Sequence, residues 1–112
     1  MENMEEIFEN VQLNLETFSK EYPKQMEAFS KMMHAIEAPG ALDVKHKELI
    51  AVSLSIAHHC KWCIAYHVKM ALRSGATTKQ VMEASWMAVL MGGGPALMYM
   101  QLVEEAIREF KA

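Results

Sequence analysis

Long apolar runs, basic clusters and a leader-like start are all missing from this chain of 112 residues. The longest apolar stretch, residues 84–100, is interrupted by three glycines and Pro95, so it falls short of the roughly 20 unbroken residues that a membrane-spanning helix needs. Lysine and arginine form no nucleic-acid-binding stripe, and the net charge is −3. The acidic start MENMEEIFEN does not have the pattern of a signal peptide. We therefore expect a cytoplasmic protein that binds neither membrane nor nucleic acid.

Cysteine is also scarce, because the chain contains only Cys60 and Cys63, arranged as C-x-x-C. In a cytoplasmic protein, a lone pair of close cysteines is more often catalytic or metal-binding than a structural staple. Two thiols three residues apart can close into a small disulfide ring and open again. The pair therefore makes thiol–disulfide chemistry the leading hypothesis.

Apolar residues, in contrast, are abundant. They make up 52% of the chain, and eleven residues are methionines. A chain of this length forms one domain, expected here over residues 1–112, and buries roughly 60–70% of its surface. One small core does not readily hide so many apolar side chains. We therefore expect self-association, with helix faces buried between subunits.

The hydrophobic pattern is helical throughout, and no segment alternates with the period of two that is typical of strands. Asp43 is a suitable N-cap, and Thr77 with Gln80 has the spacing of a capping box. The fold class predicted is all-α. Six helices are expected, at residues 4–19, 23–38, 44–57 and 60–73, from the Thr77 cap to 91, and from 95 nearly to the C-terminus.

A turn near Ala57 and His58 would bring distant reactive groups together. Glu48 and His67 are nineteen residues apart, which is roughly 28 Å along one continuous helix and too far for proton transfer. If the chain turns between them, two antiparallel helices place Glu48 beside His67. Cys63 lies four residues before His67, on the same helix face. The sequence therefore predicts a helix hairpin that gathers these three side chains.

Five short sequence features lie at characteristic distances from one another: Glu-Leu-Ile at 48–50, C-x-x-C-x-x-x-H at 60–67, Ser-Gly-Ala-Thr at 74–77, Glu83, and Gly-Gly-Pro at 93–95. Together, over roughly residues 42–100, they resemble the alkyl hydroperoxidase D-like branch of the carboxymuconolactone decarboxylase family. The first forty residues match less distinctively. The chain also departs from some members, which carry a histidine between the cysteines where Lys61 and Trp62 stand here.

The resemblance implies an all-helical fold in obligate oligomers, trimers or hexamers, and a disulfide-cycling activity that supports peroxide reduction. In the family, the equivalents of Cys60 and Cys63 are the redox pair, and those of Glu48 and His67 relay protons to them. The partners implied are a peroxiredoxin and a lipoyl-bearing or thioredoxin-type reductant. No cofactor is implied.

The chemistry of the four residues agrees with such a role. Only a thiolate attacks a disulfide or a peroxide efficiently, and a free thiol with a pKa near 8.5 is mostly protonated at neutral pH. We expect His67 to accept the proton of Cys63, and Glu48 to orient His67 or accept the proton from it. Cys60 is expected to be the more exposed sulfur, at a helix start whose dipole favours a thiolate. Which cysteine attacks first is left open, because the helix start favours Cys60 and the neighbouring base favours Cys63.

Two other functions remain open. Cys60, Cys63, His67 and Glu48 could together bind zinc, which would make the chain a metal-binding or scaffold protein without turnover. The lactone decarboxylation that names the wider family is the other alternative, but that reaction does not need a cysteine pair.

The remaining polar candidates have simpler interpretations. His58 and His59 are expected in the turn, and His34 and His46 on the surface. Glu83 is expected to be buried or to form an interhelical salt bridge.

Overall fold

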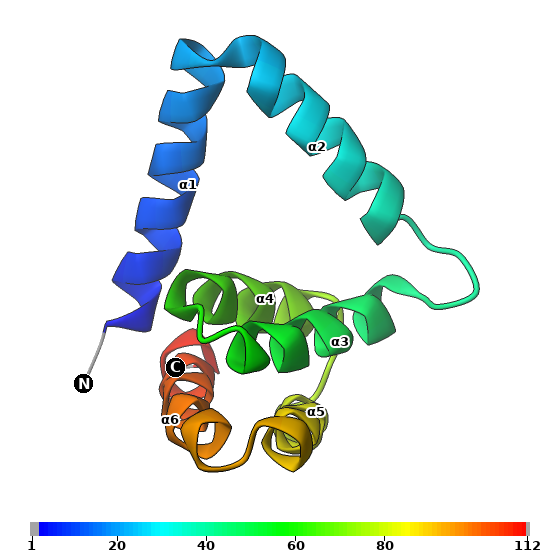
Figure 1. Ribbon diagram of the computed structural model, residues 1–112, viewed down its shortest axis with the longest axis vertical. Coiled ribbons are helices and arrows are strands. Elements are labelled where there is room, and N and C mark those ends of the chain that lie inside the picture. The colour runs from blue at the N-terminus through cyan, green and yellow to red at the C-terminus, as the bar shows by residue number, and fades with distance from the viewer. Residues whose placement is uncertain (1–2, 112) are drawn as a thin grey trace.

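The computed structural model describes residues 3–111, and all regular structure in that range is helical. The all-α prediction is confirmed, and each expected helix is present within a few residues of its predicted limits (Figure 1). The helices are α1 (Met4–Glu21), α2 (Pro23–Glu37), α3 (Val44–Ala57), α4 (Lys61–Arg73), α5 (Thr78–Gly92) and α6 (Gly94–Lys111). Asp43 caps α3, and both hydrogen bonds of the capping box form between Thr77 and Gln80 at the start of α5. No helix in the described range is long and apolar enough to cross a bilayer.

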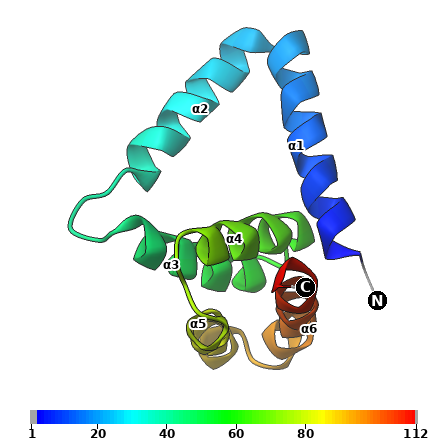
Figure 2. The ribbon, with the colours of Figure 1, turned by 180° about the vertical axis from the view of Figure 1, so that it is seen from behind.

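Helices α3 to α6 form the packed body of the molecule. The hairpin of α3 and α4 lies across α5 and α6, as both views of the ribbon show (Figures 1 and 2). The interior of this body consists mostly of aliphatic side chains, each of which contributes about 1.5–3 kcal/mol to the stability of the fold when fully buried. The largest of these are Val52, Ile56, Ile64, Val68, Val81 and Val103.

Helix α1 is attached to this body by its first turns only. Met4, Ile7 and Phe8 are buried, whereas no later residue of α1 is. The carboxylate of Glu109, on α6, accepts hydrogen bonds of 3.0 Å from the backbone N–H groups of Met4 and Glu5. A carboxylate at this position satisfies free N–H groups of the helix and interacts favourably with its dipole. Glu109 therefore anchors the start of α1 to α6.

Replacement of Glu109 by alanine is expected to lower the free energy of unfolding by about 1–2 kcal/mol, because it removes a helix cap and a favourable dipole interaction. Denaturant unfolding at a fixed protein concentration measures the effect. Glu104→Ala is the matched control, since Glu104 lies on the same helix with its side chain exposed. Equal destabilisation by the two replacements would contradict the anchoring role.

Beyond its first turns, α1 leaves the body, and α2 returns toward α3, so that the two helices lean together over the hairpin (Figure 1). Helix α2 contains no buried residue. Large apolar side chains are exposed on α2 and also on α5, where Leu90 is 72% and Met91 85% exposed. Such faces are consistent with the expected self-association, which stays a prediction.

Candidate active site

The turn predicted near Ala57 is present and joins α3 to α4. His58 ends α3 with its N–H bonded to the carbonyl of Leu54 (2.9 Å), and His59 adopts the left-handed conformation with φ of 54°. The His59 ring stacks on Tyr99 of α6, with 4.6 Å between the ring centroids. This stacking stabilises a backbone conformation that is uncommon for residues other than glycine. The two histidines are therefore turn residues, as predicted.

The two cysteines form a disulfide at the first turn of α4, with 5.2 Å between their Cα atoms. Cys60 is the N-cap of the helix, and its sulfur accepts a hydrogen bond of 3.2 Å from the N–H of Cys63. Both cysteines are partly exposed, so burial does not distinguish them. Because unpaired N–H groups and the helix dipole favour negative charge here, this position stabilises a Cys60 thiolate when the disulfide opens.

Glu48 and His67 meet across the hairpin, as the predicted turn requires. The Nδ1 atom of His67 lies 2.7 Å from Oε2 of Glu48, whose side chain is only 5% exposed, whereas the His67 ring is 23% exposed. An ionised carboxylate can only accept, so Nδ1 carries the hydrogen of this bond. In the neutral ring Nε2 is then the acceptor, which leaves the more exposed imidazole ready to take a proton.

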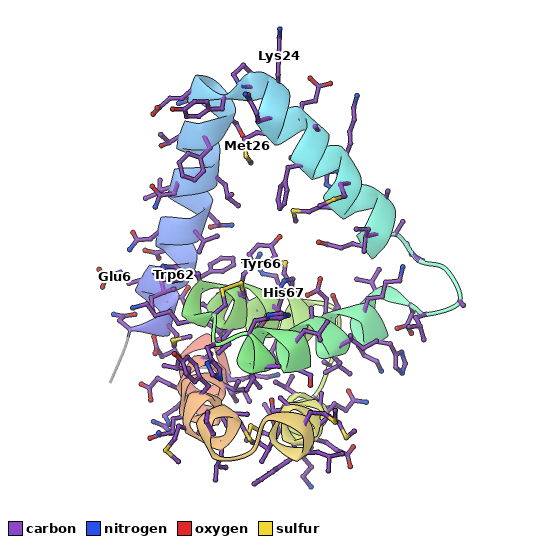
Figure 3. All side chains as sticks on the ribbon, in the orientation of Figure 1. Glu6, Lys24, Met26, Trp62, Tyr66 and His67 are labelled. Carbon is purple, nitrogen blue, oxygen red and sulfur yellow. A yellow bond between two sulfur atoms is a disulfide. The ribbon has the colours of Figure 1, made fainter. Side chains whose placement is uncertain are left out.

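Tyr66 holds the His67 ring from one side. The two rings meet edge to face at 5.1 Å, and Tyr66 also stacks on Phe8 of α1 at 6.0 Å. Figure 3 shows Tyr66 on the side of α4 that faces α1 and α2, and His67 between α4 and α3. Burial raises the pKa of the Tyr66 phenol, and the carboxylates of Glu37 and Glu48 raise it further. The phenol therefore stays neutral at physiological pH.

An apolar hollow of about 330 Å³ opens beside the disulfide, between α4 and the pair α1 and α2. We call it the Cys63 hollow. Trp62, one of the two residues between the cysteines, forms part of its wall. Cys63 and His67 thus reach the same space, which could receive the apolar part of a substrate. The hollow is lined by Val11, Leu15, Phe29, Met33, Glu37, Trp62, Cys63, Tyr66 and His67.

Glu37, the last residue of α2, is a site residue that sequence reasoning missed. It borders the Cys63 hollow, and it also borders a second hollow of about 410 Å³ that contains Lys47, Glu48 and His67. Glu37 lies outside the motif that drew attention to the other residues, and nothing in the sequence marks it as different from other helix-terminal glutamates. Only the folding of α2 back over the hairpin places it near His67.

The remaining predictions have mixed outcomes. His34 and His46 are exposed, as expected. Glu83 is also exposed, and none of the ion pairs found among residues 3–111 includes it, so the expectation of a buried or salt-bridged residue was wrong. Helix α5 turns Val81 and Ser85 inward and Glu83 outward, to a shallow groove beside Lys79.

Among residues 3–111, no three histidine, cysteine, aspartate or glutamate side chains are grouped so that they could hold a metal ion.

Comparison with known proteins identifies relatives of the whole fold. The model of the carboxymuconolactone decarboxylase family matches residues 23–105. A family protein of Legionella pneumophila has 40% sequence identity and a TM-score of 0.93, with 97% of each chain covered. A family protein of Thermotoga maritima has 26% identity and a TM-score of 0.83, over 93% of this chain and 89% of that one.

Curated sequences give shorter matches. Uncharacterized protein 4 in the cox locus of Paracoccus denitrificans is 47% identical over 70 residues, which are 62% of this chain and 63% of that protein. An uncharacterized protein of Cupriavidus necator is 42% identical over 77 residues, covering 69% and 68% of the two chains. The match to the Paracoccus protein thus spans slightly less than two thirds of its length.

Proposed function

This chain belongs to the carboxymuconolactone decarboxylase family, and we propose that it is a thiol–disulfide oxidoreductase of the alkyl hydroperoxidase D-like branch that supports peroxide reduction. One observation carries the proposal. The Cys60–Cys63 disulfide lies at a helix start, on the same helix face as a histidine that is hydrogen-bonded to a buried glutamate. A structural disulfide would not need an adjacent base, whereas a cycling disulfide needs a group that moves protons.

Reduction of the disulfide follows from this arrangement. A thiolate of the reductant attacks one cysteine sulfur, forms a mixed disulfide with it and releases the other cysteine as a thiolate. His67 first takes the proton of the reductant thiol, and where Cys63 is released it passes this proton to Cys63. Where Cys60 is released, the N–H groups at the start of α4 stabilise its charge. Attack by a second thiolate on the mixed disulfide releases the oxidised reductant. The pair has then gained two electrons, and it holds the two protons of the reductant once both thiolates have been protonated.

Reoxidation runs the same steps in reverse. His67 takes the proton of the Cys63 thiol, and the buried Glu48 carboxylate orients the ring and balances its positive charge. The two electrons pass to the disulfide of an oxidised partner, for which we propose a peroxiredoxin. That partner then reduces a hydroperoxide to an alcohol and water. For the reductant we propose a lipoyl-bearing or thioredoxin-type protein, since the apolar Cys63 hollow suits the alkyl part of a dithiol.

Intact mass measured on protein purified without added metal, before and after treatment with a chelator, tests the proposal. Mild oxidation of the reduced protein is expected to remove two hydrogens per chain, and a dithiol reductant is expected to restore them. Cys60→Ser and Cys63→Ser should each lack this change. Two thiols that resist oxidation, or that react only after a chelator has removed a metal, would contradict the proposal and favour a zinc-binding or scaffold protein.

A further inference from the structure

Glu37 gives the Cys63 hollow a fixed negative charge. Among the described residues that line the hollow it is the only acidic one, and its side chain is partly buried. The other ionisable side chains there, apart from the cysteine, are those of Tyr66 and His67. Tyr66 is a neutral phenol, and the buried carboxylate of Glu48 lies behind His67. Outside the lining, the Glu48 carboxylate and the Arg73 guanidinium act on Tyr66 with opposite signs. The charge on the wall of the hollow that an incoming molecule meets is therefore mainly that of Glu37.

The position of Glu37 is secured even though α2 contains no buried residue. The ammonium group of Lys47, on α3, donates to the carbonyl oxygens of Ile36 (2.7 Å) and Ala38 (2.6 Å), on either side of Glu37. A cation at this end of a helix interacts favourably with the last carbonyls and with the dipole. Lys47 borders the second hollow but not the Cys63 hollow. It therefore fixes the end of α2 without placing its own charge in the path to Cys63.

We propose that Glu37 is a specificity-determining residue that disfavours thiols carrying an extra negative charge at the Cys60–Cys63 disulfide. This inference rests on the proposed function. The attacking sulfur is itself a thiolate, and a carboxylate elsewhere on the same molecule adds a second charge that Glu37 repels within the hollow. Neutral dithiols and thiols with an ammonium group are then preferred over thiols with a net negative charge, such as glutathione-like peptides.

Three small thiols of similar size separate this charge effect from all others: 3-mercaptopropionate, its neutral amide, and cysteamine. The second-order rate constant for opening the disulfide is measured with each, by acid quench and intact mass. In Glu37→Gln, the rate with 3-mercaptopropionate relative to the amide is expected to rise about fivefold, and the rate with cysteamine relative to the amide to fall by a similar factor. Differences in intrinsic reactivity among the probes cancel, because each is compared between variant and wild type.

Two controls accompany this variant. Glu27→Gln removes the same charge from α2, at an exposed residue paired with Lys31 and outside the hollow, and should leave both ratios unchanged. Glu37→Asp keeps the charge and should keep most of the wild-type preference. The effect of Glu37→Gln should also shrink in about 1 M salt, where charges more than about 3 Å apart are largely screened.

The outcomes distinguish this inference from the proposed function. If the three thiols reduce the wild-type disulfide and the two ratios in Glu37→Gln stay within twofold of wild type, the specificity role is wrong while the proposed function stands. An equal change of all three rates would likewise overturn it, because a structural role of Glu37 does not depend on probe charge. If none of the thiols opens the disulfide, both proposals fail.

Discussion

Cys63→Ser is expected to abolish peroxidase-supporting turnover, with a loss of at least about a thousandfold, as is typical when an enzyme loses its reacting group. The serine hydroxyl cannot form the disulfide that accepts two electrons from the reductant. Serine also has no sulfur, so the variant lacks the thiolate that acts as nucleophile at this position. The measurement is peroxide consumption in an assay that couples a dithiol reductant, this protein and a peroxiredoxin. Full activity in this variant would contradict the proposed function.

Cys60→Ser is the companion variant, and its fold is expected to be intact. Cys60 is the N-cap of α4, and its sulfur accepts the N–H of Cys63. Serine is among the preferred N-cap residues, so its hydroxyl can accept the same hydrogen bond. Loss of turnover in this variant is therefore attributable to chemistry rather than to unfolding, which circular dichroism and thermal unfolding check.

The two single-cysteine variants also decide which sulfur exchanges with the partner. In each variant the remaining thiol can form a mixed disulfide but cannot resolve it. If Cys60 is the exchanging sulfur, Cys63→Ser accumulates the mixed disulfide and Cys60→Ser does not. Accumulation only in Cys60→Ser would assign the exchange to Cys63, which borders the apolar hollow.

The sequence was sufficient to predict the helices because local signals determine them, and to predict the central hairpin because of what two distant residues require. Asp43 and Thr77 mark helix starts, and both form the expected caps. The requirement that Glu48 reach His67 indicated a turn near Ala57, and the two side chains do lie 2.7 Å apart. Here a chemical argument about distant residues was as informative as the hydrophobic pattern.

Features that depend on how separate elements pack could not be predicted. Glu37 reaches the site only because α2 folds back and Lys47 attaches its end to α3. Glu83 belongs to the motif that supports the family resemblance, yet its position on α5 turns it toward solvent. The link between Glu109 and the start of α1 joins residues more than one hundred positions apart. Sequence spacing carries no information about such contacts.

His67→Asn is expected to slow reoxidation of the reduced protein at pH 7 by about a hundredfold or more, which is the usual range for loss of a general base. In this variant no group takes the proton of Cys63, so the reaction depends on the small fraction of spontaneous thiolate. That fraction grows with pH, so the reoxidation rate of the variant should approach the wild-type rate above about pH 8.5. If disturbed packing alone slowed the reaction, the ratio of the two rates would not depend on pH in this way. The measurement is the rate of reaction with bis(2-hydroxyethyl) disulfide, a neutral model substrate, between about pH 6 and pH 10. This range extends to both sides of the pKa of a free thiol, which is about 8.5.

His46→Asn provides the matched control for this prediction. The ring of His46 is also bonded to a carboxylate, with Nδ1 2.6 Å from Oδ1 of Asp43, but it lies exposed at the start of α3 and borders neither the Cys63 hollow nor Cys60. The His46→Asn variant should react at the wild-type rate at every pH.

A companion variant, Glu48→Gln, keeps an oxygen that accepts from His67 but removes the negative charge. Its reoxidation rate at pH 7 should be about tenfold lower than that of wild type and should approach the wild-type rate at high pH. Equal rates for the His67 and His46 variants, or a deficit that stays constant up to pH 10, would show that the pair of His67 and Glu48 supports the fold and not the proton transfer.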